Sequence, residues 1–195
     1  MQQVSSHQVR RTLLFKWAVQ DYFVSKRFPC MLGSLIAHIE DPIVRHPLVE
    51  NLWEEHGEGA TTKSHHALYC DLLRSIGLAP VFDKRLANEA TRAFIDTQES
   101  LARQDVFLGL GAFCYANEFI TIEEFGPLEE AVGHEFPTAD LSFFKANREV
   151  DPHHARQTED VIEALLTSPE DLQWVEKGAG IALEARVRFY DALLG

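Results

Sequence analysis

Apolar residues recur along most of the chain at spacings of three and four positions, which places them on one face of an α-helix. The alternating Val, Ile and Thr runs that are typical of half-buried strands do not occur between turn residues in this sequence. The pattern therefore predicts an all-α protein. We expect about eight helices with short connections, packed into one compact helical bundle over residues 1–195.

Prolines, glycines and capping residues predict where these helices begin and end. Pro29 is expected to end the first helix and Pro152 to interrupt a later one, because a proline inside a helix removes a backbone hydrogen bond. Gly77 is expected to end a helix as well. The expected N-terminal caps are Thr61 or Thr62, Asp83 and Ser168. Helices are expected at residues 7–28, 30–39, 42–57, 63–77, 84–103, 105–133, 139–151, 153–166 and 172–194.

Composition restricts the function classes. The formal net charge is −12, and the 18 Lys and Arg residues are scattered among 30 acidic residues, which argues against a nucleic-acid partner. No apolar run approaches the roughly 20 residues of a membrane span, and the N-terminal segment meets Trp17 and then a charge before a secretory signal could form. Cys30, Cys70 and Cys114 lie far apart in apolar stretches, which is typical of buried thiols in a reducing compartment. We therefore expect a cytoplasmic protein with no nucleic-acid or membrane partner.

Glu118 is the first candidate for chemistry. It lies in "FCYANEFITI", where apolar residues flank it on every side of the expected helix. A buried carboxylate needs a cation, a metal ion or several hydrogen bonds, since an isolated ionised group is costly in a low-dielectric interior. The alternative is a groove-facing Glu118 that pairs with a Lys or Arg side chain.

A second candidate is the segment "FFKANREVDPHHARQTE", which places Asn147, Asp151 and His154 on one stripe if a single helix continues through it. The alternative is that Asp151 caps a new helix that begins at Pro152. In either case His154 lies one turn from Asp151. An Asp-x-x-His pair resembles the Glu-x-x-His geometry with which helical bundles hold paired irons.

A third candidate is the pair Glu55 and His65, which flanks the glycine-broken turn between two expected helices. This turn can let the helices lie side by side, so that both side chains point inward. Adjacent alternatives are His56, His66 and His153, and a helical His is often solvated or hydrogen-bonded rather than a ligand. The combined candidate set is Glu55, His65, Glu118, Asp151 and His154. Carboxylates with imidazoles suit Fe(II) or Mn(II) better than a structural zinc, which favours thiolates.

These stretches carry a resemblance to a known family. The chain resembles the heme-oxygenase-like metal oxidases, relatives of the thiaminase-type and pyrroloquinoline-quinone-synthase helical bundles, none of which needs heme. The resemblance covers most of the sequence and rests on "FP" at 28–29, "NLWEEHGEG" with "SHHALYCDLLRSIGL", the glutamate in "YANEF", and "FFKANREVDPHHA". It implies a heme-oxygenase-like bundle whose metal ligands and catalytic centre are Glu55, His65, Glu118, Asp151 and His154.

Two positions depart from the family pattern. Asn147 stands where the resemblance implies a His, and Lys26 stands, by alignment on "FP", where it implies a Glu on the first long helix. An amide is a poor ligand and an ammonium repels a dication, so one iron could be lost while another is kept. Alternatively, the metal is gone and Lys26 pairs with the orphaned carboxylates.

The function that the resemblance implies is that of a nonheme iron oxidase or oxygenase. It would hold one or two Fe(II) ions, or Mn, without heme, and use O2 on a small amino-acid-like, amine or fatty-acid-like metabolite in an apolar pocket. Aromatic residues that could line this pocket are Tyr22, Phe23, Phe113, Tyr115, Phe119 and Phe144.

Two other functions stay open at this point. One is a metal-free protein that binds a small molecule or a protein partner, with Lys26 compensating Glu55 and Glu118. The other is a thiaminase-type, metal-independent enzyme, which needs a reactive Cys or a Glu base. Bundles of this type commonly pair, so a homodimer is a further hypothesis.

Overall fold

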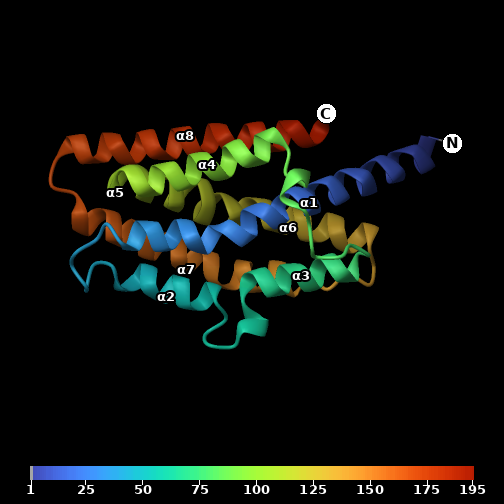
Figure 1. Ribbon diagram of the computed structural model, residues 1–195, viewed down its shortest axis with the longest axis horizontal. Helices are drawn as coiled ribbons and strands as arrows, with labels where there is room; N and C mark the ends of the chain where they lie inside the picture. Colours follow the sequence, from blue (N-terminus) through green and yellow to red (C-terminus); the bar gives the residue numbers. More distant parts are fainter. Residues whose placement is uncertain (1) are drawn as a thin grey trace.

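The computed structural model describes the backbone of residues 2–195 and the side chains of residues 10–195. Within these limits the chain is helical and has no strand (Figure 1). The α-helices are α1 (Gln2–Ile36), α2 (His46–Glu55), α3 (His65–Ser75), α4 (Glu89–Gln104), α5 (Val106–Phe113), α6 (Ile120–Glu135), α7 (Ser142–Leu165) and α8 (Pro169–Leu194). A π-helical segment, η3 (Cys114–Phe119), joins α5 to α6, and we call Val106–Glu135 the central run. The prediction of an all-α bundle of about eight helices is confirmed.

The helices pack in two layers (Figure 1). Helices α4, α5 and α8 contact one another in one layer, and α2 and α3 pack against α7 in the other. Helix α1 contacts members of both layers, and η3 contacts α7 on one side and α8 on the other. Polar side chains that α1, η3 and α7 turn inward therefore share one interior.

The central run is held inside the bundle by a close approach of α5 to α8. Gly111 on α5 and Gly178 on α8 lie where a Cβ atom would overlap the backbone of Val175 and Leu108, respectively. Only glycine allows the two helices to come this close. The run is long and apolar enough to cross a membrane, but 56% of its most apolar window is buried within the bundle, as in a core helix.

Two predicted helix breaks are wrong. Helix α1 continues through Pro29, and α7 continues through Pro152. A proline inside a helix costs about 3 kcal/mol, but both helices bury apolar residues on each side of it. In α1, for example, Phe23 precedes Pro29 in the core and Leu32 follows it. Packing of the flanking turns therefore outweighs the local cost.

Two predicted caps are also wrong. Ser64, rather than Thr61 or Thr62, caps α3, because its side chain accepts the backbone N–H of the third residue in the helix. Asp83 caps only the short 3-10 turn Lys84–Leu86, and Asn88 caps α4. A Ser, Asp or Asn can cap any turn that begins beside it, so sequence alone left several choices in these polar stretches.

Two predicted boundaries are confirmed. Gly77 follows the end of α3 with φ of +90°, a conformation that suits glycine. The side chain of Ser168 accepts the Asp171 N–H at 3.3 Å, and Asp171 accepts the Ser168 N–H at 2.8 Å. This reciprocal capping box starts α8.

The prediction that all three thiols are buried is wrong for one of them. Cys70 and Cys114 are buried, whereas Cys30 is exposed on α1 just after Pro29. An apolar neighbourhood in the sequence does not decide which face of a helix a residue occupies.

Candidate metal centre

Glu118 reaches the interior from a π-helical turn. The wider backbone of η3 is held by Asn117, whose Nδ2 donates to the Ala112 carbonyl at 3.0 Å and to Gln98 Oε1 at 3.2 Å. Turns of this kind are frequent at functional sites. The turn leaves Glu118 only 3% exposed, so the carboxylate is buried as the apolar sequence around it predicts.

The environment of Glu118 disfavours a charged carboxylate. Burial, reinforced by the neighbouring Asp151 carboxylate, raises the pKa of Glu118 well above its ordinary value. Asn51 opposes this effect, because its Nδ2 donates to Glu118 Oε1 at 2.9 Å. The amide also fixes the direction in which the other carboxylate oxygen points.

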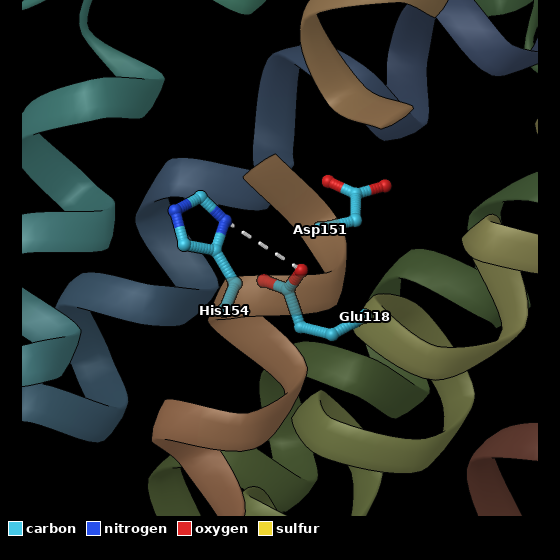
Figure 2. Close-up of side chains that lie close together, drawn as sticks. All are labelled: Glu118, Asp151 and His154. Carbon is cyan, nitrogen blue, oxygen red and sulfur yellow. Dashed lines mark ion pairs between the residues drawn. The ribbon is translucent and has the colours of Figure 1, made fainter. Parts of the chain in front are cut away.

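Helix α7 brings Asp151 and His154 to the same place. Because α7 is unbroken, Asn147, Asp151 and His154 lie on one buried stripe, and Asp151 is not a helix cap. Figure 2 shows Asp151 and His154 on successive turns of α7, with Glu118 reaching toward them from the central run. One ligand atom from each of these three side chains can be chosen so that all lie within 4.8 Å of one another.

Asp151 is oriented by a hydroxyl of the central run. Thr121 Oγ1 lies 2.8 Å from Asp151 Oδ2, the shortest of its three possible acceptor distances, and its single proton is also within reach of the Asn117 and Glu118 carbonyls. Burial raises the pKa of Asp151 to about 7, although Thr121 and the more distant charge of Arg186 lower it. Asp151 is therefore a buried carboxylate that gains from a nearby cation.

His154 is held by a carboxylate that sequence reasoning did not select. Its Nε2 lies 2.6 Å from Glu54 Oε2, and its Nδ1 lies 3.8 Å from Glu118 Oε2 without a hydrogen bond (Figure 2). The contact with Glu54 assigns the proton to Nε2, which leaves the lone pair of Nδ1 directed at Glu118. This is how a metal-binding imidazole is usually oriented.

Glu55 and His65 meet across the glycine-rich turn. Gly57, Glu58 and Gly59 all have positive φ, so the chain reverses sharply between α2 and α3. His65 Nδ1 lies 2.7 Å from Glu55 Oε1 but outside hydrogen-bond geometry, and each residue is 7% exposed. Burial disfavours the imidazolium, yet the Glu55 carboxylate, with more distant acids behind it, raises the pKa of His65.

The predicted residues meet around one interior space. A cavity of about 70 Å³ is lined by Glu55, His65, Glu118 and Asp151. His154 lies behind its wall, in contact with Glu118. The structure thus gathers all five candidates, although they come from four separate helical segments.

The two departures from the family pattern have different outcomes. Asn147 lines the cavity and donates its Nδ2 to the Phe143 carbonyl at 2.7 Å. Lys26 is exposed, and its ammonium lies 5.7 Å from the ring centroid of Tyr22. The hypothesis that Lys26 pairs with Glu55 and Glu118 is therefore wrong, because it lies on a different face of α1.

The aromatic wall of the cavity also differs from the prediction. It consists of Phe28, Phe125 and Phe143. The six residues named from the sequence are not among the lining residues: Tyr22, Phe23, Phe113 and Phe144 are buried in the core, Phe119 is partly buried, and Tyr115 is 36% exposed. An apolar helical stripe does not distinguish core from cavity wall.

Several residues of the site were missed by sequence reasoning. They are Asp21, Asn51, Glu54, Thr121 and Arg186. The sequence contains an indication of four of the residues around the site. Asn51, Glu54 and Glu55 follow one another at helical spacing, and Asp21 interrupts an otherwise apolar stripe of α1. Which partner each would find depends on packing between distant helices.

The donor set fits a divalent metal ion. Across residues 10–195, no Lys or Arg nitrogen forms an ion pair with Glu54, Glu55, Glu118 or Asp151. Nδ1 of His65 and Nδ1 of His154 are buried without hydrogen bonds. Buried acids without a Lys or Arg partner and the free lone pair of His154 Nδ1 are costly alone, and both are satisfied by a hard-to-borderline dication such as Fe(II) or Mn(II).

Comparison with known proteins identifies the family. The family model described as "Iron-containing redox enzyme" matches residues 16–187. A 4-aminobenzoate synthase of Chlamydia pneumoniae is 26% identical over 174 residues, covering 85% of this chain and 74% of that protein. A CADD-like protein of unknown function from Nostoc punctiforme superposes with a TM-score of 0.79 at 22% identity, over 94% of this chain and 81% of that one.

A second solved structure identifies the fold. A domain of unknown function with a heme-oxygenase-like fold, from Shewanella denitrificans, superposes with a TM-score of 0.74 at 17% identity. The match covers 94% of this chain and 78% of that one. The resemblance drawn from the sequence is therefore confirmed, and the chain belongs to the iron-containing redox enzyme family with a heme-oxygenase-like fold.

Proposed function

We propose that this chain is a nonheme iron-dependent oxidase or oxygenase that uses O2 to oxidise a small metabolite in its buried cavity. The observation that carries the proposal is the convergence of Glu118, Asp151 and His154, whose ligand atoms lie within 4.8 Å of one another. Membership of the iron-containing redox enzyme family supports iron as the metal. The relative named 4-aminobenzoate synthase supports a role in small-molecule metabolism.

The residues that would hold iron are Glu118, Asp151 and His154, with Glu55 and His65 on the adjoining wall of the site. When bound, iron supplies the redox chemistry with O2. Glu54 would keep the His154 proton on Nε2, and Asn51 and Thr121 would keep Glu118 and Asp151 in fixed orientations. The phenyl rings that line the cavity would exclude water from a substrate.

The alternatives from the sequence gain less support. The metal-free binding protein needed Lys26 at the acids, and Lys26 is exposed elsewhere on α1. The thiaminase-type enzyme needs a reactive Cys or a Glu base. Burial raises the pKa of both the Cys70 and the Cys114 thiols, and the exposed Cys30 is not among the residues that line the cavity. Buried, protonated thiols are weak nucleophiles.

The test is metal loading followed by O2 uptake. Metal-depleted protein is loaded with Fe(II) under anaerobic conditions, desalted, and assayed for iron by elemental analysis, then for O2 consumption in an electrode. We expect about one or two irons per chain and O2 consumption that Glu118→Gln abolishes, whereas Glu58→Gln, a matched change of an exposed glutamate, keeps both. Only trace iron, or O2 uptake unaffected by Glu118→Gln, contradicts the proposal.

A further inference from the structure

The cavity has a second polar end that the metal centre does not explain. Asp21 on α1 and Arg186 on α8 line the same cavity as the metal-centre residues. The positive charge of Arg186 lowers the pKa of Asp151, so the two ends lie within electrostatic reach of each other. A molecule in this cavity therefore meets both.

The charge of Arg186 is already neutralised by the protein. Its Nε donates to Glu124 Oε1 at 2.9 Å and its Nη2 donates to Glu124 Oε2 at 2.5 Å, which is the bidentate arrangement. Its Nη1 donates to the Ala116 carbonyl at 2.8 Å, and Tyr190 donates to Glu124 at 2.8 Å. The two side chains neutralise each other, and Nε, Nη1 and Nη2 of Arg186 each donate to an acceptor of the protein.

Asp21 is left as the surplus carboxylate at this end. Among the side chains from residue 10 onward, no Lys, Arg or His nitrogen forms an ion pair with it. The nearby Tyr69 hydroxyl lowers the pKa of Asp21 slightly, but it donates its single proton to the Ala18 carbonyl at 3.0 Å. Burial raises the pKa of Asp21 to about 7, with Arg186 opposing part of that rise.

We infer that Asp21 is the recognition group for a small primary amine, whose ammonium donates to the Asp21 carboxylate while its carbon chain lies in the cavity. Ser25, one turn further along α1, lines the cavity and offers the ammonium a second acceptor oxygen. Val24 and the three lining phenyl rings provide apolar walls for the carbon chain. The inference rests on the proposed function and narrows its substrate class, because a fatty-acid-like carboxylate would meet the uncompensated charge of Asp21.

The test compares three ligands of one shape: n-butylamine, n-butanol and butyrate. Each is titrated into Mn(II)-loaded protein and into metal-free protein, with binding followed by calorimetry in both forms and by amide chemical shifts in the metal-free form. We expect n-butylamine to bind about tenfold or more tightly than n-butanol, because a charge-assisted hydrogen bond replaces a neutral one. Butyrate should bind more weakly than either.

Two variants locate the ammonium. Asp21→Asn keeps the shape of the side chain and removes its charge, and it should abolish the preference for the amine. Asp71→Asn, the same change at an exposed position, should leave the preference intact. Asp151→Asn is measured beside them and should reduce the preference less than Asp21→Asn does, which separates Asp21 from the acids of the metal centre. The comparison of the three ligands in the wild-type chain does not depend on any variant.

Equal binding of amine and alcohol, or a preference that survives Asp21→Asn, overturns the inference. A preference lost in Asp151→Asn but not in Asp21→Asn also overturns it, since the ammonium would then sit at the metal centre. The proposed function fails independently: a chain that takes up no iron but keeps the Asp21-dependent preference retains the amine site without the oxidase. A chain that binds iron and consumes O2 but shows no preference for the amine supports the proposed oxidase and overturns the amine site.

Discussion

The two polar ends of the cavity differ in how their carboxylates are paired. At the α8 end, Arg186 and Glu124 form a bidentate pair that Tyr190 completes. At the α7 end, the acids form ion pairs with imidazoles and with no Lys or Arg side chain from residue 10 onward, and Nδ1 of His154 has no hydrogen bond. The ends also differ in burial, because Glu118 is 3% exposed whereas the Glu124 side chain is 20% exposed. The more deeply buried acids therefore have the weaker partners.

This difference separates a structural charge from a functional one. A buried ion pair with all its hydrogen bonds made can be maintained by the protein alone. A buried group of acids without a cation weakens the metal-free fold, and it is retained where something outside the chain neutralises it. The α8 end should therefore respond to mutation through stability, and the α7 end through metal binding.

The largest expected effect is on stability, from Arg186→Met. Methionine leaves the partly buried Glu124 without its cation and removes the donor to the Ala116 carbonyl. Breaking such a pair costs about 3 kcal/mol of unfolding free energy, measured by urea denaturation of the metal-free protein. Glu124→Gln added to Arg186→Met should recover part of this loss, because no charge is then left alone.

The control for this change is Arg188→Met on the same helix. Arg188 pairs with Glu184 at 3.0 Å, and both side chains are more than 70% exposed. An exposed pair of this type contributes about 0.5 kcal/mol or less. Equal effects at positions 186 and 188 would show that the pair of Arg186 and Glu124 does not stabilise the fold more than a surface pair does.

The next effect is on metal affinity, from Glu54→Gln. The glutamine amide can donate to Nε2 of His154 or accept from it, so the imidazole is no longer held with its proton on Nε2. Loss of such an orienting carboxylate typically weakens metal binding about 10- to 100-fold, measured by competition with a metal-binding dye. The unfolding free energy of the metal-free protein should change little, since removing one of several crowded acids offsets the lost contact.

Glu58→Gln supplies the matched control, because Glu58 lies in the exposed turn between α2 and α3. It should leave metal affinity unchanged. If Glu54→Gln also leaves the affinity unchanged, then Glu54 does not orient His154, and other contacts organise the α7 end.

A smaller effect is expected from pH. The pKa values of Asp151 and Asp21 are about 7 in the folded chain, whereas an unfolded Asp titrates near 4. Between these values the folded state holds protons that the unfolded state has released, so lowering the pH from 8 to 6.5 should stabilise the metal-free protein. Each of the two groups contributes about 1 kcal/mol over this window, measured by urea denaturation.

The raised pKa of His65 acts in the same direction, because its stabilising charge is gained as the pH falls. The lowered pKa values of His154 and His66 act in the opposite direction, and the window stops at 6.5 because their effect grows below the pKa of an unfolded His. Bound metal should remove the contribution of Asp151 to the pH dependence of stability and leave the contribution of Asp21. The two ends of the cavity can then be distinguished by their response to metal. A flat profile for the metal-free protein contradicts this prediction.

Much of the fold and the outline of the site could be predicted from the sequence. Helical periodicity identified the central run, and an acid within an apolar stretch identified Glu118. Helix breaks at Pro29 and Pro152 could not be judged, because the deciding term is the packing of the flanking turns against other helices. For the same reason the sequence left open whether Asp151 caps a helix or faces the site.

The residues that hold the ligands were harder to predict than the ligands themselves. Glu54 and Glu55 are adjacent in the sequence, and only the packing of α2 against α7 shows that Glu54 meets His154. Lys26 was placed at the site by counting back from "FP", but successive residues of a helix point about 100° apart. The positions of α1 that face the cavity are instead Asp21, Val24, Ser25 and Phe28.

The smallest expected effect tests that placement. Lys26→Glu creates a carboxylate at the position that family alignment would assign to a ligand, yet Lys26 is exposed and lies near Tyr22. We expect no change in iron stoichiometry and a change in unfolding free energy of about 0.5 kcal/mol or less. Elemental analysis and urea denaturation measure the two quantities. A gain of iron in this variant would mean that α1 can turn the face that carries Lys26 toward the α7 end. The difference in charge pairing between the two ends would then depend on the rotation of α1, and not on the side chains that line the cavity.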